Sequence, residues 1–235
     1  MKAITEVIWG GVLVVCAAVI PKMAVAQEVE AAAWDSTYRP ATYQVQVEQF
    51  RAYPDSRKDI VFLGNSLTAH PNWNELLDLK HARNRGISGD ITFGVLERLD
   101  EVTGGKPSKV FLLIGINDVS RNIPDSVILE NYKKIVRRIK SETPSTKLYI
   151  QTLLPTNNSF TKFKRHYNRE ENVSWLNNEL KKLAAEEKIT LVDLHPEFAD
   201  REGRLIEAYT HDGLHLTHEG YRKWAEVLKE GRYLK

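Results

Sequence analysis

The arrangement of apolar segments is the feature that most restricts how this 235-residue chain can fold. From Asp59 onward, short apolar runs alternate with longer segments in which apolar residues recur at helical spacing. The short runs predict strands at residues 59–64, 82–87, 109–115, 147–154 and 189–194. Because strands that alternate with helices need crossover connections, the sequence predicts one α/β domain whose parallel sheet is covered on both faces.

Four other segments carry the periodicity and the end signals of helices. They are residues 90–105, 124–142, 169–188 and 217–230. The first ends on two glycines, and the second opens with a proline and closes on basic residues. Residues 27–58 are polar and aromatic without a strong period, so we expect a lead-in that packs on the outside of the domain.

Polar loops follow the predicted strands at the edge where open parallel sheets bind their ligands. The first strand ends in Gly64, Asn65 and Ser66, and the third ends in "GIND", residues 115–118. "NRGISGD", residues 84–90, follows the second strand, and "HDGLHLTHEGY" precedes the last helix. The sequence therefore predicts that the candidate functional residues lie at one edge of the sheet.

Ser66 can be interpreted in two ways. Serine is among the commonest residues that cap a helix, so its place after a strand does not by itself mark a nucleophile. Ester hydrolysis by serine also needs a base, a group that orients the base, and donors for the oxyanion. The other loops supply candidates for all three, which favours the nucleophile.

The base is expected to be a histidine, because no other side chain titrates so close to neutral pH. Seven histidines are present, and the spacing of "DGLH" favours His215. A turn from Asp212 to His215 lets the carboxylate accept a hydrogen bond from Nδ1, which leaves Nε2 free to face Ser66. We expect surface positions for His81, His166 and His218, a pocket-lining position for His70, a capping or packing role for His195, and an orientation of His211 away from the site.

Three groups are candidate donors for the oxyanion. They are the Ser66 N–H, a glycine N–H in "ISGD" and the side-chain amide of Asn117. Glycine lets a carbonyl oxygen approach the backbone closely, and asparagine donates a hydrogen bond without adding charge. Taken alone, Asn117 could equally be a turn-forming residue before Asp118.

Four blocks in this order, "GNSLT", "GISGD", "GIND" and "DGLH", resemble those of the SGNH, or GDSL, hydrolase family. With the strands between them, the resemblance covers residues 59 to about 230. It implies an SGNH hydrolase domain over residues 59–235, folded as a three-layer α/β/α, flavodoxin-like sandwich with a five-stranded parallel sheet. It also implies ester hydrolysis without a cofactor.

The resemblance assigns roles by position. It implies that Ser66 is the nucleophile and the first oxyanion donor, that Gly89 is the second donor, and that Asn117 is the third. Asp212 and His215 complete the implied catalytic triad.

The chain departs from the family pattern at one position of the first block. The family usually has aspartate before the serine, whereas this chain has Asn65. Because asparagine can accept similar hydrogen bonds without the charge, we expect the same turn. Gly86 is assigned to a turn and not to catalysis.

The first 26 residues have the pattern of a secretory signal peptide. Lys2 precedes an apolar stretch from Val7 to Ile20, which is short for a membrane-spanning helix, and Ala24 to Ala26 match a cleavage site. We therefore expect residues 1–26 to be removed and the mature protein to be periplasmic or secreted, without stable membrane insertion. An uncleaved anchor and lipidation of Cys16 are the alternatives.

Composition excludes several other kinds of function. The net charge of +2, with acidic and basic residues mixed along the chain, gives no indication of nucleic-acid binding. The one cysteine, Cys16, lies in the predicted signal, so the mature chain would have no disulfide and no thiol nucleophile. We expect neither a metal nor a cofactor.

The segment after the fourth predicted strand, residues 157–172, is rich in basic residues and offers one indication of the substrate. Lys164 and Arg165 are the candidate contacts for an anionic group beside the ester, and a solvated charged loop is the alternative. The chain also resembles exported family members that remove acetyl groups from sugars, including the sialate O-acetylesterase type.

The expected function is therefore hydrolysis of acetyl esters on carbohydrates such as sialic acid, through an acyl-enzyme. A lysophospholipase, a general short-chain esterase or a thioesterase is the first alternative. A catalytically silent glycan-binding domain is the second, and the complete set of serine, asparagine, aspartate and histidine argues against it.

Overall fold

The computed structural model describes residues 34–235, so the predicted signal peptide lies outside the described residues. Five strands form one sheet in the order β2-β1-β3-β4-β5, and every pair is parallel. The strands are β1 Ile60–Gly64, β2 Ala82–Gly86, β3 Lys109–Leu113, β4 Lys147–Gln151 and β5 Thr190–Val192. This is the strand order of flavodoxin-like folds, in which ligands bind where the order reverses, between β1 and β3.

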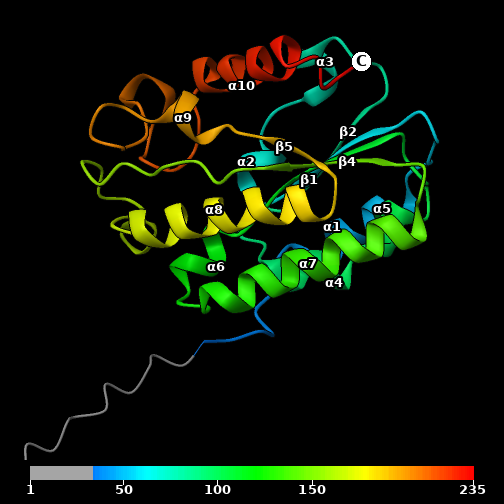
Figure 1. The fold of residues 1–235 in the computed structure, drawn as a ribbon, viewed down its shortest axis with the longest axis horizontal. Coiled ribbons are helices and arrows are strands. Elements are labelled where there is room, and N and C mark those ends of the chain that lie inside the picture. The colour runs from blue at the N-terminus through cyan, green and yellow to red at the C-terminus, as the bar shows by residue number, and fades with distance from the viewer. Residues whose placement is uncertain (1–33) are drawn as a thin grey trace, which may run out of the picture. The chain divides into compact units, whose positions relative to one another are not determined.

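Helices cover both faces of the sheet, which gives the three layers (Figure 1). One face carries α4 Thr92–Glu97, α5 Asp100–Thr103, α7 Asp125–Glu142 and α8 Glu170–Glu186. The other carries α3 Trp73–Leu77, α9 His195–Phe198 and α10 His218–Glu230. The predicted α/β/α fold with a five-stranded parallel sheet is confirmed.

The central strands are apolar on both sides because each side faces a separate core. In β1, Val61 and Leu63 belong to the core shared with α4, α7 and α8, whereas Phe62 belongs to the core shared with α3 and α10. Phe62 stacks on Trp73 with ring centroids 4.0 Å apart, and Trp73 meets Trp224 edge to face. These two cores fix the position of the sheet edge at which the polar loops lie.

The lead-in contains a helix that the sequence did not predict. Helix α1 spans Tyr43–Ala52 and buries Tyr43, Val47 and Phe50. The Tyr43 hydroxyl donates a hydrogen bond to the carbonyl of Gly94 at 2.7 Å, which ties α1 to α4. The apolar period was weak because only these three of its ten residues are buried.

Residues 90–105, predicted as one helix, form α4 and α5 with a break at Arg98. The Arg98 side chain is fully buried. It donates hydrogen bonds to the Asp90 carboxylate at 3.0 Å and to the carbonyls of Gly64 and Arg85 at 3.2 and 3.0 Å. The helix stops where this side chain turns inward to the ends of β1 and β2.

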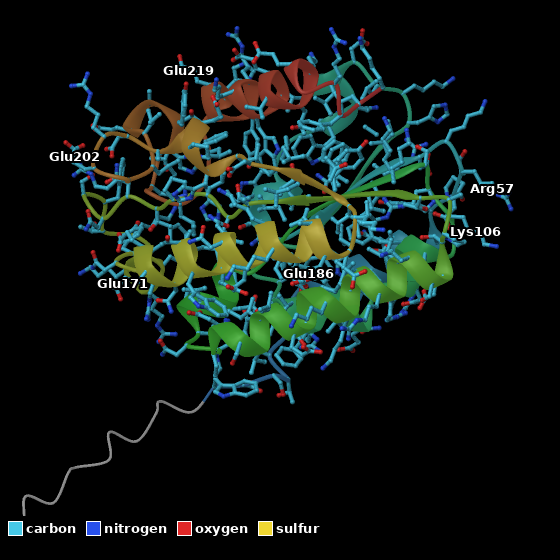
Figure 2. All side chains as sticks on the ribbon, viewed as in Figure 1. Arg57, Lys106, Glu171, Glu186, Glu202 and Glu219 are labelled. Atoms are coloured by element: carbon cyan, nitrogen blue, oxygen red, sulfur yellow. The ribbon has the colours of Figure 1, made fainter. Side chains whose placement is uncertain are left out.

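Charged residues cover the outside of the described body (Figure 2). Examples that project outward are Arg57, Lys106, Glu171, Glu186, Glu202 and Glu219. Among the helices of residues 34–235, none is both long enough and apolar enough to cross a membrane.

Candidate active site

Ser66 lies at the sharp turn by which the chain leaves β1. It is the first residue of α2, Ser66–Ala69, and the residue is almost fully buried. A Cβ on Gly64 would lie 2.1 Å from the carbonyl oxygen of Leu113 and 2.4 Å from Oγ1 of Thr68. Only glycine fits there, so the tight exit from β1 places the Ser66 hydroxyl at the sheet edge.

Asn65 fixes this turn in the way expected of the residue before the serine. Its Oδ1 accepts a hydrogen bond from the backbone N–H of Leu67 at 3.1 Å and so caps α2. Helix α2 has only four residues, so its dipole contributes little to the stabilisation of negative charge at Ser66. Stabilisation of an anion therefore rests on individual N–H groups.

Ser66, His215 and Asp212 form a hydrogen-bonded chain. Ser66 Oγ lies 3.0 Å from His215 Nε2, and His215 Nδ1 lies 2.9 Å from Asp212 Oδ2. The other carboxylate oxygen accepts the backbone N–H groups of Leu214 at 3.1 Å and His215 at 2.8 Å. The carboxylate thus holds the His215 ring with Nε2 toward the serine, as a base for a nucleophile requires.

Hydrogen bonds keep Asp212 ionised although it is buried. Burial raises the pKa of Asp212, but hydrogen bonds from the His215 backbone and ring and from the Leu214 backbone outweigh burial, so the pKa lies below its usual value. An ionised Asp212 accepts the Nδ1–H bond and stabilises the imidazolium that forms when His215 takes a proton.

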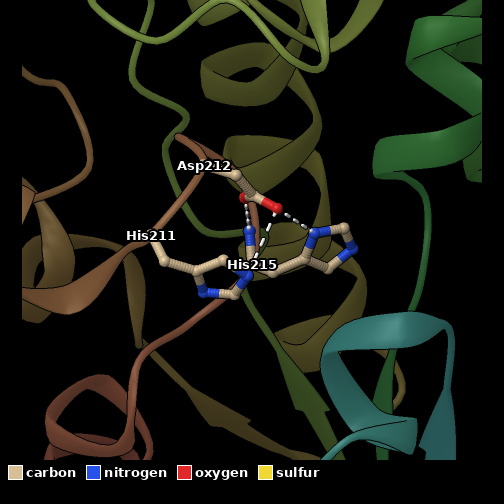
Figure 3. A group of neighbouring side chains, drawn as sticks. All are labelled: His211, Asp212 and His215. Atoms are coloured by element: carbon tan, nitrogen blue, oxygen red, sulfur yellow. Dashed lines mark hydrogen bonds and ion pairs between the residues drawn. The ribbon is translucent and has the colours of Figure 1, made fainter.

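His211 contacts the same carboxylate, contrary to our expectation that it points away (Figure 3). Its Nε2 lies 3.4 Å from Asp212 Oδ2. The potential ligand atoms of His211, Asp212 and His215 lie within 4.8 Å of one another, a spacing that could hold a metal ion. A metal ion at this position would replace the hydrogen bond between Asp212 and His215 Nδ1. That hydrogen bond orients His215 toward Ser66, so the observed arrangement fits a catalytic triad better than a metal site.

Two backbone N–H groups of residues that line the active-site cavity have no acceptor within residues 34–235. They belong to Ser66 itself and to Gly89, and both residues line the same cavity. Gly89 has a φ of +82°, which an L side chain rarely adopts, so glycine is needed to turn the chain after β2. Both groups are free to donate to an oxyanion. Gly86, assigned to a turn, ends β2 against the backbone of α2.

The Asn117 amide lines this cavity with one hydrogen free. Asn117 lies in α6, Ile116–Ser120, directly after β3. Its Nδ2 donates one hydrogen to the carbonyl of Asp90 at 2.9 Å, and an amide nitrogen carries a second. The side chain can therefore donate to an oxyanion while it stays anchored to the loop after β2.

A buried carboxylate joins the loops after β2 and β3. Asp118 accepts hydrogen bonds from the backbone N–H and the hydroxyl of Thr92, the N–H at 3.0 Å from Oδ1. Burial raises the pKa of Asp118 to about 7. These hydrogen bonds tie the start of α6, which carries Asn117, to the start of α4.

His166 is a site residue that the sequence prediction placed wrongly at the surface. It is half-buried, lines the cavity, and has Nε2 3.0 Å from Asn117 Oδ1. Burial lowers the pKa of His166 to about 4, so the ring is neutral at neutral pH. Nε2–H then donates to Asn117 Oδ1 and keeps the Asn117 amide nitrogen toward Asp90 and the cavity. The one signal in the sequence that could have indicated a site position for His166 is its place in the loop after β4, at the sheet edge that carries Ser66.

These groups open into a cavity of about 490 Å³. It is lined by Ser66, Gly89, Asn117, His215, Tyr38, His70, Ser88, Ser120, Arg121, Phe163, Arg165, His166 and Leu214. The sequence predicted a contact for Arg165 and a pocket position for His70, and it missed Tyr38 of the lead-in and Arg121. Lys164 is exposed and does not line the cavity, so the predicted substrate contact is retained for Arg165 alone.

The sequence segment that forms this site matches a family model. The model of the GDSL-like lipase/acylhydrolase family covers residues 62–223, from β1 into α10. The chain belongs to this family. Its four sequence blocks had predicted that membership, and the family makes the protein an acylhydrolase; the sialate O-acetylesterase subtype stays a prediction.

Similar proteins come from animals and bacteria. Platelet-activating factor acetylhydrolase IB subunit alpha2 of Homo sapiens is 30% identical over 182 residues, which cover 75% of this chain and 76% of that protein. A Streptococcus pneumonia protein named for platelet activating factor is 30% identical, with a TM-score of 0.74 over 83% of this chain and 92% of that one. A GDSL-like lipase of Bacteroides thetaiotaomicron, 24% identical, has the same fold, with a TM-score of 0.70 over 80% and 96% of the two chains.

The pH dependence of the GDSL hydrolase tests the assignment of the base. We expect kcat/KM to rise with pH from acid to neutral solution, because the His215 ring must be neutral to accept the Ser66 proton. His166, with its pKa lowered by burial to about 4, stays neutral over most of this range. Initial rates with an acetyl ester measure the profile.

Two histidine variants serve as controls for this profile. His211→Gln removes the contact with Asp212 and should leave the rise in place, and His218→Gln changes an exposed residue at the start of α10. A rate that is flat from about pH 5 to 8 would count against His215 as the base.

Proposed function

We propose that this GDSL hydrolase removes acetyl groups from carbohydrates such as sialic acid, outside the cytoplasm. The observation that carries the proposal is the hydrogen-bonded chain from Ser66 Oγ through His215 to Asp212, which lies at a cavity lined by three residues with a free N–H donor. The partner is a small-molecule or glycan ester, and no nucleic acid takes part.

The reaction follows from the positions of these groups. Ser66 Oγ attacks the ester carbonyl carbon while its proton moves to His215 Nε2. The oxyanion forms beside the N–H groups of Ser66 and Gly89 and the Asn117 amide. The alcohol leaves with the proton from His215, and water, activated by His215, then hydrolyses the acyl-enzyme.

The cavity lining favours a small acyl group and a polar alcohol. Among the lining side chains, only Phe163 and Leu214 are wholly apolar, and Phe163 lies edge-on to the His215 ring at 4.9 Å. A long acyl chain would need an extended apolar surface to replace its contact with water. Hydroxyl, imidazole and guanidinium groups instead suit the hydroxyls of a sugar.

A lipid or general short-chain ester is the second candidate. The relatives named platelet-activating factor acetylhydrolase favour it, since an acetyl group is removed there from a different kind of alcohol. Both candidates share the acetyl group and differ in what carries it.

A substrate panel separates the candidates. We expect turnover of a chromogenic acetyl ester, which a silent glycan-binding domain would not hydrolyse. Acetylated sialic acid and acetylated xylan should be cleaved with higher kcat/KM than lysophospholipid or a platelet-activating factor analogue. Preference for either lipid would overturn the carbohydrate assignment and leave the acetylesterase.

A further inference from the structure

A second cavity adjoins the active-site cavity, and Ser66 is not part of its lining. It has a volume of about 360 Å³ and shares Ser120, Arg121 and Arg165 with the first. Asp35, Asn122 and Arg169 complete its lining. The Ser120 hydroxyl donates to the carbonyl of Asn117 at 2.9 Å, so the second cavity begins one helical turn from the oxyanion donor.

Three guanidinium groups and one carboxylate line this second cavity. The Asp35 carboxylate already accepts the backbone N–H and the hydroxyl of Thr37, at 2.7 and 2.6 Å. No ion pair within the described part of the chain includes Arg121, Arg165 or Arg169. The lining of the second cavity therefore carries three positive charges against the one negative charge of Asp35.

Two of the three arginines are held in place by neutral groups. The Arg121 guanidinium lies 3.0 Å from the centre of the Tyr38 ring, and Arg169 donates to Asn122 Oδ1 at 2.8 Å. These contacts fix the direction of the side chains without neutralising them. Most of the N–H donors remain available, and their planar, forked arrangement matches the oxygens of a carboxylate or a phosphate.

We propose that the second cavity binds an anionic group, a carboxylate or a phosphate, carried by the alcohol part of the ester. This inference rests on the proposed acetyl hydrolysis. The acetyl group is neutral, so any permanent charge on the substrate must lie on the alcohol part of the ester. The N–H donors of the first cavity stabilise the oxyanion that forms during the reaction. The arginines of the second cavity are therefore available to bind a permanent negative charge on the substrate. An acidic sugar would place its ester in one cavity and its acid group in the other.

Adjacent basic residues provide a matched pair of variants. Arg165 lines both cavities and is exposed, so Arg165→Glu should reverse the local charge without disturbing the core. Lys164 is exposed, lines neither cavity, and undergoes the same change of net charge in Lys164→Glu. Melting temperatures of both variants check that the fold is retained.

The kinetic test compares acetylated sialic acid, an acetylated sugar phosphate and a neutral acetylated sugar of similar size. We expect at least one anionic substrate to exceed the neutral one in kcat/KM by about tenfold, the size expected of a hydrogen-bonded charged group. Arg165→Glu should remove that preference and Lys164→Glu should keep it. High ionic strength should reduce it. The carboxylate and phosphate arms identify which anion the site prefers.

A binding measurement decides the matter independently of turnover. Calorimetric titration with free sialic acid and with a sugar phosphate should give an affinity at least about tenfold weaker for Arg165→Glu than for wild type or Lys164→Glu. Equal affinity of all three proteins, or equal kcat/KM for charged and neutral esters, would overturn the anion site. Failure to hydrolyse any acetyl ester would overturn the proposed function, and the titration would still test the cavity.

Discussion

Ser66→Ala should lower kcat for an acetyl ester by about 10⁴ or more. The change removes the attacking oxygen, and within the described residues the Ser66 hydroxyl has one hydrogen-bond partner, His215 Nε2 at 3.0 Å. Loss of that single contact should leave the packing around β1 intact, so the melting temperature should change little. Steady-state rates and labelling by a fluorophosphonate, which wild type should take up and the variant should not, measure the effect.

A second serine in the same cavity provides the control. Ser88 lines the cavity beside Gly89, but it makes no hydrogen bond to His215. Ser88→Ala should therefore retain turnover and labelling. Wild-type turnover in Ser66→Ala would mean that another group attacks the ester.

The fold and the hydrogen-bonded chain were predictable because local patterns encode them. Strands that are apolar on both faces can be recognised as continuous apolar runs in the sequence. The carboxyl ends of parallel strands lie at the same edge of the sheet, so the residues that follow these strands lie close together. The turn in "DGLH" likewise brings the Asp212 carboxylate within hydrogen-bonding distance of both the backbone N–H and the ring of His215. Each of these features depends on short stretches of sequence.

The positions of His166 and Tyr38 were not predictable, because they depend on how distant segments pack. His166 reaches Asn117 across 49 positions of sequence, and its basic, polar neighbours suggested an exposed loop. Tyr38 lines the cavity from the lead-in before helix α1. The lead-in has no strong apolar period, so the sequence did not indicate which of its residues pack against the domain. Arg98 was missed for the same reason: a charged side chain is rarely buried unless paired, and its partners lie on other elements.

Asn117→Ala should lower kcat by about 10²–10³ and change KM little, the usual result of removing one oxyanion donor. The donor acts on the charge that develops in the transition state and not on the neutral ester, so ground-state binding should be nearly unaffected. Kinetics with a chromogenic acetyl ester, measured beside the melting temperature, separate this from a loss of structure.

Asn117→Asp is the matched variant, because it keeps the size of the side chain and replaces the donating nitrogen with an oxygen. The new carboxylate would face the carbonyl of Asp90, which now accepts from Asn117 Nδ2 at 2.9 Å, and would add negative charge beside the oxyanion. We expect kcat to fall further than in the alanine variant. If Asn117 only shaped the turn before Asp118, both variants would lose melting temperature and keep their kcat, and the oxyanion would then depend on the N–H groups of Ser66 and Gly89 alone.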